Sequence, residues 1–195
     1  MKKFTDNYFS ETLGVTQTES KYLSNMFKFE SIDKNIRLVE EGTKWDRVYF
    51  ISTGLLRFYY TTTGGKEFNK GFFKEKDFIW PITPSARIEP SLFSIESLSQ
   101  SDLWSVSFRD FQHTLKSYGV WEKFALPYAE NLADQKFKRE YDFLVKNAQS
   151  RYDGLILKLG KLVDRIPDYH LASYLGITNV ALSRIKKRKL ISNII

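Results

Sequence analysis

The apolar and polar positions of the first half of the chain alternate over short distances. From Ile36 onward, runs of apolar residues are separated by turn residues, and these runs cover 36–39, 48–51, 55–61, 67–73, 78–80, 93–98 and 103–108. Runs of this length that are rich in Phe, Tyr and Val predict β-strands. No helical stretch separates them, so they favour a double-sheet jelly roll or barrel of seven or eight strands over a parallel sheet. The paired glycines Gly64 and Gly65 predict a tight hairpin between two of the strands.

A helical pattern precedes the strands and returns after them. Residues 1–28 predict polar helices, and apolar residues recur at steps of three and four after Phe108, with a kink or break expected at Pro127. A further helix is predicted over 152–163. The long helix needs an apolar partner, which is either the β module of its own chain or the same helix of a second copy. We favour the second alternative, a homodimer formed through residues 116–146.

The last pattern is that of two short amphipathic helices. Leu171, Ala172 and Leu175 share one helix face, and Leu182 and Ile185 share another, at the spacing of half-buried helices. Gly176 lies between them, where the chain must turn sharply, and a glycine reaches a left-handed conformation without a clash. Thr178 is placed to cap the second helix, a role worth about 1 kcal/mol. These features predict a helix-turn-helix.

Charge decides between this motif and an ordinary helical hairpin. Arg184 is followed by the basic run 186–189, so the second helix combines a basic outer face with an apolar inner face. Such a helix is suited to lie against phosphates. Residues 1–115 hold 15 Lys/Arg and 15 Asp/Glu, whereas 116–195 hold 15 and 8, so the whole excess of +7 lies in the second part. The asymmetry favours binding of double-stranded DNA by the C-terminal part.

These patterns predict three segments: a β-roll domain with N-terminal helices over 1–115, a linker helix over 116–146 and a helix-turn-helix domain over 147–195. Composition fits a globular protein, with 42% hydrophobic and 27% charged residues. The sequence contains no cysteine, which excludes disulfides and fits a reducing cytoplasm. No apolar run approaches a membrane span, and the first sixteen residues have no signal-peptide core. We therefore expect a cytoplasmic protein without a membrane partner.

The order of parts resembles the family of the cyclic-AMP receptor protein and Fnr, over residues 36–189. The segments that carry the resemblance are Glu40-Glu41-Gly42, the run 48–57, Gly65-Lys66-Glu67, the run 171–177 and Leu182-Ser183-Arg184. The resemblance implies an α+β fold: an N-terminal jelly roll like that of cyclic-nucleotide-binding domains, a long dimerisation helix and a C-terminal helix-turn-helix. It also implies a sequence-specific transcriptional regulator, which acts as a homodimer and can contact RNA polymerase.

The same resemblance assigns roles to residues of the second motif helix. Asn179, Val180 and Arg184 fall on the family's base-contacting positions, and we count the neighbouring Ser183 with them. An arginine can bind a guanine edge through two hydrogen bonds, an asparagine can read adenine, and a valine can contact a thymine methyl. Phosphate contacts are expected from Tyr169, Thr178, Lys186 and Lys187.

The segment that corresponds to the family's cyclic-nucleotide pocket has different residues in this chain. Cyclic-nucleotide binders of this fold use a glycine–glutamate pair for the ribose and then an arginine beside Ser or Thr for the phosphate. The matching segment 76–93 lacks the pair, and its candidate pocket residues are Arg87, Ser91 and Phe93. We therefore expect that the roll does not bind cyclic AMP. We expect a different small-molecule effector or none, and no cofactor or metal is indicated.

Two other classes of function would need residues that differ from those of a regulator. A ligand-sensing or protein-interaction module of this fold would not need the basic run 186–189. A jelly-roll metalloenzyme needs clustered ligands, but the only histidines are His113 and His170, and neither lies on a predicted strand. We expect His113 to be a partly exposed helical residue, and we expect the protein not to be an enzyme.

Overall fold

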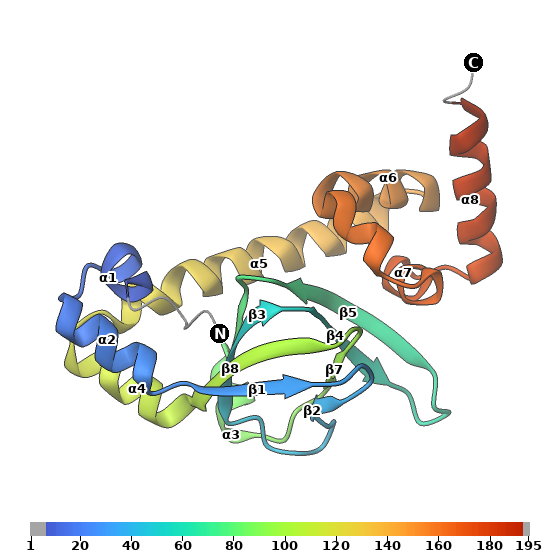
Figure 1. The fold of residues 1–195 in the computed structure, drawn as a ribbon. Coiled ribbons are helices and arrows are strands. Elements are labelled where there is room, and N and C mark those ends of the chain that lie inside the picture. The colour runs from blue at the N-terminus through green and yellow to red at the C-terminus, as the bar shows by residue number, and fades with distance from the viewer. Residues whose placement is uncertain (1–6, 193–195) are drawn as a thin grey trace. The chain divides into compact units, whose positions relative to one another are not determined.

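The computed structural model describes residues 7–192 (Figure 1). Contacts divide the chain into two compact units. The first, here called the roll unit, runs to Phe58 and resumes over Phe72–Leu132. The second, here called the C-terminal unit, combines Tyr59–Gly71 with the chain from Ala133 onward. The second unit therefore contains one hairpin that the sequence pattern had assigned to the β module.

The strands of the described chain form two four-stranded sheets, with strand orders β1-β8-β3-β6 and β2-β7-β4-β5. The pairings of β1 with β8, β2 with β7, and β3 with β6 and β8 are antiparallel. The bounds are β1 (Lys28–Ile32), β2 (Arg37–Val39), β3 (Arg47–Thr53), β4 (Leu55–Thr61), β5 (Glu67–Lys74), β6 (Phe78–Ile79), β7 (Ser94–Ser97) and β8 (Ser101–Ser107). The double-sheet expectation is confirmed. The strand β1 was missed, because its mostly exposed residues carry little apolar signal.

Aromatic side chains fill the space between the two sheets of the roll. Trp45, Phe58 and Phe93 pack on one another with ring centroids 5.2–5.8 Å apart, and Phe73 lies 4.2 Å from Phe58. They belong to a cluster that also holds Val39, Tyr49, Ile51, Leu56, Ile79, Ile95 and Leu103. The interior of the roll is thus a packed core.

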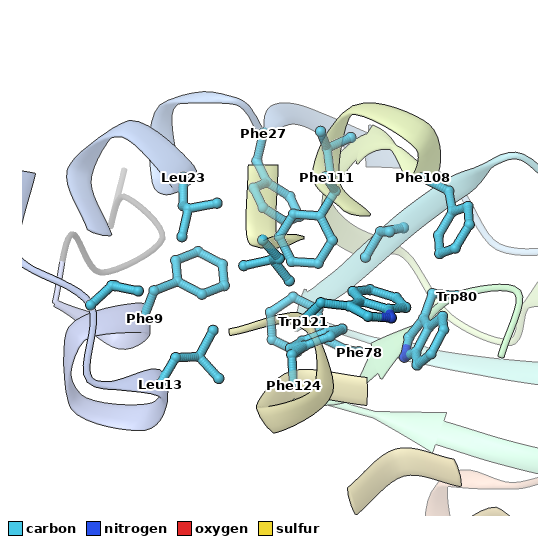
Figure 2. Close-up of a cluster of buried hydrophobic side chains, with 14 residues drawn as sticks. Phe9, Leu13, Leu23, Phe27, Phe78, Trp80, Phe108, Phe111, Trp121 and Phe124 are labelled. Atoms are coloured by element: carbon cyan, nitrogen blue, oxygen red, sulfur yellow. The ribbon is translucent and has the colours of Figure 1, made fainter. Parts of the chain in front are cut away.

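A second core lies where the helices of the roll unit meet its strands (Figure 2). The helices are α1 (Tyr8–Leu13), α2 (Gln17–Asn25), α3 (Pro84–Ile88) and α4 (Phe108–Ser117). Thr16 and Glu19 form a capping box at the start of α2. The core holds Phe9, Leu13, Val15, Leu23, Phe27, Val48, Phe78, Trp80, Val106, Phe108, Phe111, Leu115, Trp121 and Phe124. These contacts attach α1, α2, α4 and the start of the next helix to the sheet.

The long helix α5 spans Trp121–Val145 and continues through Pro127. The helical region breaks eight residues earlier, between α4 and α5, where Gly119 has a φ of +70°. A break at Pro127 is therefore wrong, whereas a kink there stays a prediction. A proline inside a helix costs one backbone hydrogen bond, and here aromatic contacts on both sides of it offset that cost. Phe124 and Tyr128 lie 5.8 and 6.2 Å from the ring of Trp80.

The C-terminal unit contains the last part of α5 and the helices that follow it. These are α6 (Ala148–Leu159), a 3₁₀ turn (Gly160–Arg165), α7 (Asp168–Leu175) and α8 (Asn179–Ser192). Asn147 caps α6 by accepting a hydrogen bond from the Ser150 N–H at 2.9 Å. The three-segment division with boundaries at 115/116 and 146/147 remains a prediction. It was based on charge and periodicity along the chain, whereas the two units are defined by which residues pack together.

Candidate nucleic-acid interface

The helices α7 and α8 form the turn that the sequence predicts. Leu171, Ala172 and Leu175 are buried on α7, and Leu182 and Ile185 are buried on α8. Gly176 ends α7 with a φ of +67°, in the left-handed region. A Cβ at this position would lie 2.7 Å from Cε1 of Phe143, on α5. Both the conformation and the close approach of Phe143 therefore require a glycine.

Thr178 caps the second helix of the motif. Its Oγ1 accepts a hydrogen bond from the Ala181 N–H at 3.2 Å, and its carbonyl accepts one from the Leu182 N–H at 3.0 Å. These bonds satisfy backbone donors at the helix start, where no preceding carbonyl is available. The predicted cap is therefore present, and α8 begins at Asn179 with a fixed orientation.

The residues predicted to read bases lie together on the outer face of α8. Asn179, Val180, Ser183 and Arg184 are exposed, and Lys187 extends the same stripe by one turn. At 100° per residue this stripe is on the side of the helix away from the buried Leu182 and Ile185. The structure thus brings the predicted set together on one accessible surface.

The residues predicted to contact phosphates differ in exposure and in whether their side chains already have a partner within the chain. Lys187 and Tyr169 are exposed, and the Tyr169 ring packs on His170 with centroids 4.0 Å apart. Lys186 is paired with the Asp168 carboxylate, in the first turn of α7, and the Thr178 hydroxyl serves as the cap. Lys187 is therefore the member of the set whose ammonium group is best placed to meet a phosphate, while Lys186 ties α8 to α7.

Sequence reasoning missed the attachment of the β4–β5 hairpin to α7. The Ser173 hydroxyl accepts a hydrogen bond from the Asn69 N–H at 2.9 Å and donates one to the Glu67 carbonyl at 3.0 Å. The Asn69 side-chain amide reaches the His170 carbonyl and Nδ1, both at 3.2 Å. Because β5 is the edge strand of its sheet, α7 covers backbone groups that would otherwise face solvent.

Arg139 of α5 joins the same contact from the other side. Its guanidinium donates hydrogen bonds to the carbonyls of Lys70, Asn69 and Tyr174, at 2.9–3.1 Å. It also lies 4.2 Å from the centre of the Tyr174 ring. One arginine thus binds the hairpin, α5 and α7 together through planar, directional donors.

A weak signal for this attachment was present in the sequence. Asn69 interrupts an aromatic β-strand, where asparagine is disfavoured. His170 and Ser173 are polar residues that face the hairpin within a helix whose other side is buried. Each is unremarkable alone, and their partners lie about a hundred positions away in the chain. Only the fold brings them together.

The three candidate pocket residues are placed in the roll unit, and each is engaged within it. Arg87 donates hydrogen bonds to the carbonyls of Pro81 and Ile82, at 3.1 and 2.6 Å, and lies over the rings of Trp80, Phe108 and Trp121. Ser91 donates to the carbonyl of Phe93 at 2.7 Å, and the Phe93 ring is part of the roll core. Their role as a ligand pocket stays a prediction.

Solved structures share this architecture. FixK2 from Bradyrhizobium japonicum is 15% identical, with a TM-score of 0.77 and 86% of each chain covered. A CooA mutant from Carboxydothermus hydrogenoformans is 14% identical, with a TM-score of 0.70 and 95% of this chain and 84% of that chain covered. A protein described as a Crp/Fnr-family transcriptional regulator from Eubacterium rectale is 16% identical, with a TM-score of 0.67 and coverage of 95% and 88%. The chain has the Crp/Fnr fold.

No family model and no curated protein matches the sequence. The chain therefore has the Crp/Fnr fold with a sequence far from those of the structures that share it. Among the described residues, no helix is both long and apolar enough to cross a membrane, and no group of three or more His, Asp or Glu could hold a metal ion.

The turn glycine provides a test of this geometry. Gly176→Ala should lower the free energy of unfolding of the C-terminal unit by at least about 1–2 kcal/mol. The left-handed conformation is strained for alanine, and the added methyl group would clash with the Phe143 ring. The measurement is chemical denaturation followed by circular dichroism.

Gly64→Ala is the matched control, since a Cβ there meets nothing closer than 4.0 Å and its φ is not positive. It should leave stability unchanged or slightly raised. Equal effects of the two substitutions would show that the turn does not need a glycine.

Proposed function

We propose that the protein is a sequence-specific DNA-binding transcriptional regulator of the Crp/Fnr type, which acts as a homodimer and whose roll does not bind cyclic AMP. The observation that carries the proposal is the exposed stripe on α8, formed by Asn179, Val180, Ser183, Arg184 and Lys187. A capped, well-anchored helix that presents such a stripe has the shape and the donors needed to enter a major groove.

The chemistry of the stripe suits direct reading of bases. Arg184 is exposed in the second turn of α8, so its guanidinium can reach a guanine edge. Asn179 at the helix start can pair with adenine, and the exposed Val180 can contact a thymine methyl. Lys187 continues the stripe toward the backbone of the DNA. A charged contact with a phosphate there adds affinity but does not discriminate between base sequences.

The loss of cyclic-AMP binding is supported by the contents of the roll. Its interior is occupied by the rings of Trp45, Phe58 and Phe93. The Arg57 guanidinium, buried in the roll, donates to the Glu96 carboxylate at 2.8 and 3.0 Å. Arg87, the candidate pocket arginine, is held by its own loop. A cyclic nucleotide would have to displace these partners.

The dimer is supported by an unusual surface on α5. Phe137, Tyr141 and Leu144 are 71%, 55% and 78% exposed, and they fall within about 60° on one side of the helix. Arg139 and Phe143, which contact the hairpin and α7, lie on the opposite side. Large apolar side chains that recur at steps of four and three are typical of a helix that packs on a second helix.

The alternative is a ligand-sensing or protein-interaction module of the same fold that does not act on DNA. The exposed stripe on α8 argues against it, because four of its five members are polar or charged. A protein interface would more often present apolar or aromatic anchors at its centre.

Binding to a pool of duplex genomic fragments tests the DNA proposal. Affinity should fall steeply as salt is raised, because bound lysines and arginines release counterions from the DNA. Arg184→Ala should reduce discrimination between sequences by about 1–3 kcal/mol at one base position. Lys187→Ala should weaken binding to all sequences alike and reduce the salt slope by about one per subunit, which is about two for the dimer. Selection from the pool, followed by titrations at several salt concentrations, measures both.

Lys44→Ala, in the roll unit, serves as the control and should change neither quantity. Undetectable or salt-insensitive binding would contradict the proposal. If Lys187→Ala relaxed specificity more than Arg184→Ala did, the two roles would have to be exchanged.

Sedimentation equilibrium tests the dimer. Phe137→Glu should shift the protein from dimer to monomer, because a carboxylate in an apolar seam must be desolvated. Leu157→Glu is the control, since Leu157 is also a highly exposed apolar residue but lies on α6. A wild-type monomer at high concentration, or dissociation by both substitutions alike, would contradict a seam on α5.

A further inference from the structure

Three cationic side chains gather in the C-terminal unit at a place that no proposed role above uses. Lys70 comes from β5, and Lys136 and Arg139 come from α5, where they are three residues apart and share one side of the helix. Arg139 donates to the carbonyl of Lys70 at 2.9 Å, which joins the helix directly to the strand. Lys70 is half-buried, whereas Lys136 is exposed, so the cluster opens to solvent on one side.

Aromatic rings form the rest of the surroundings. The Lys70 Nζ lies 5.6 Å from the centre of the Tyr60 ring, on β4, and the Arg139 guanidinium lies over Tyr174. Cations above ring faces are attracted by the ring quadrupole, so the rings hold both groups in place. Glu67 on the same hairpin and His170 on α7 are further titratable residues of the contact between the hairpin and α7, beside Tyr60 and Tyr174.

The electrostatics of the cluster are unfavourable in the protein alone. Burial and, to a smaller extent, the charges of Lys136 and Arg139 together lower the pKa of Lys70 to about 7. The pKa of Lys136 is lowered too, by removal of water and by Arg139. The charged neighbours that lower the pKa of Lys70 are thus both cations, and Lys70 holds its proton only in part at neutral pH.

We propose that Lys70, Lys136 and Arg139 form a binding site for a phosphate group. A compact dianion placed beside the three cations relieves their mutual repulsion and restores the proton on Lys70. The ammonium groups of Lys70 and Lys136 supply movable donors, and Arg139, which is fixed by carbonyls, supplies charge. The phosphate belongs either to a small-molecule effector or to the backbone of bound DNA, and the experiment below distinguishes these sources.

The site lies where a bound anion can influence the docking of the β4–β5 hairpin on α7. Asn69, next to Lys70, is the residue through which the hairpin binds Ser173 and His170 of α7. An anion held between β5 and α5 favours the arrangement in which the hairpin is docked on α7. It can therefore shift the population of molecules in which the helix-turn-helix is held in place.

Binding of sulfate by the full chain tests the site, because sulfate is a dianion that does not titrate between pH 6 and 9. Calorimetry at constant ionic strength should show saturable binding in the absence of DNA. The affinity should fall by up to about tenfold per pH unit above pH 7, since Lys70 must take up a proton as sulfate binds. Binding should accordingly be accompanied by proton uptake, which is measured in buffers of different ionisation enthalpy.

Lys70→Met should reduce the affinity at least about tenfold and should weaken the pH dependence, because the group that takes up the proton is then missing. Lys66→Met is the matched control, because Lys66 lies on the same hairpin over the Phe68 ring, outside the cluster. It should change neither quantity. Lys136→Met provides a second variant and should weaken sulfate binding without altering the fold.

Several results separate the outcomes. Absence of saturable binding, or equal losses in Lys66→Met and Lys70→Met, would overturn the proposal. If duplex DNA displaces sulfate and Lys70→Met reduces the salt slope of DNA binding, the phosphate is that of DNA. The phosphate is that of an effector if sulfate and DNA bind at the same time, and if sulfate changes the DNA affinity of the wild-type protein but not that of Lys70→Met. The sulfate measurement needs no DNA, so its outcome is independent of the proposed function.

Discussion

The C-terminal unit depends on one hydroxyl group, that of Ser173. It accepts a hydrogen bond from the Asn69 N–H and donates one to the Glu67 carbonyl, so a single side chain of α7 satisfies two backbone groups of β5. Buried backbone groups without partners are costly. The hairpin is consequently part of the same packed unit as the helix-turn-helix, although it belongs to the β-roll by strand order.

Arg139 adds a second constraint and connects stability to electrostatics. Its contacts with three backbone carbonyls fix the relation of α5 to the hairpin and to α7. The same charge lies close to Lys70 and Lys136, and it contributes to the lowered pKa of both lysines. The Arg139 guanidinium, which holds the unit together, therefore also contributes to the repulsion between cations that a bound anion would reduce. Packing and regulation would then share one residue.

The parts of the fold that follow from local patterns could be predicted from the sequence. The buried faces of α7 and α8, the left-handed Gly176 and the Thr178 cap each depend on residues within four positions of one another. The strand runs were equally visible, apart from β1. The position of the helix break was not visible: α5 continues through Pro127, where Phe124 and Tyr128 pack on Trp80, a residue that is distant in the sequence.

The candidate sites divide in the same way. The reading stripe of α8 is a property of one helix, so its members could be named from spacing and from the family resemblance. The engagement of Arg87 with its own loop, the pairing of Lys186 with Asp168 and the cluster around Lys70 depend on long-range contacts. A sequence pattern carries no information about which distant residue becomes the partner.

Hydrogen exchange at the Asn69 amide tests the central claim, that α7 holds the hairpin. The account predicts that this amide is protected in the wild-type protein, and that Ser173→Ala speeds its exchange by up to about tenfold, as expected for the loss of one hydrogen bond. Ser183→Ala, on the exposed face of α8, should leave the Asn69 amide unchanged. Fast exchange in the wild type, or equal exchange in all three proteins, would contradict the account.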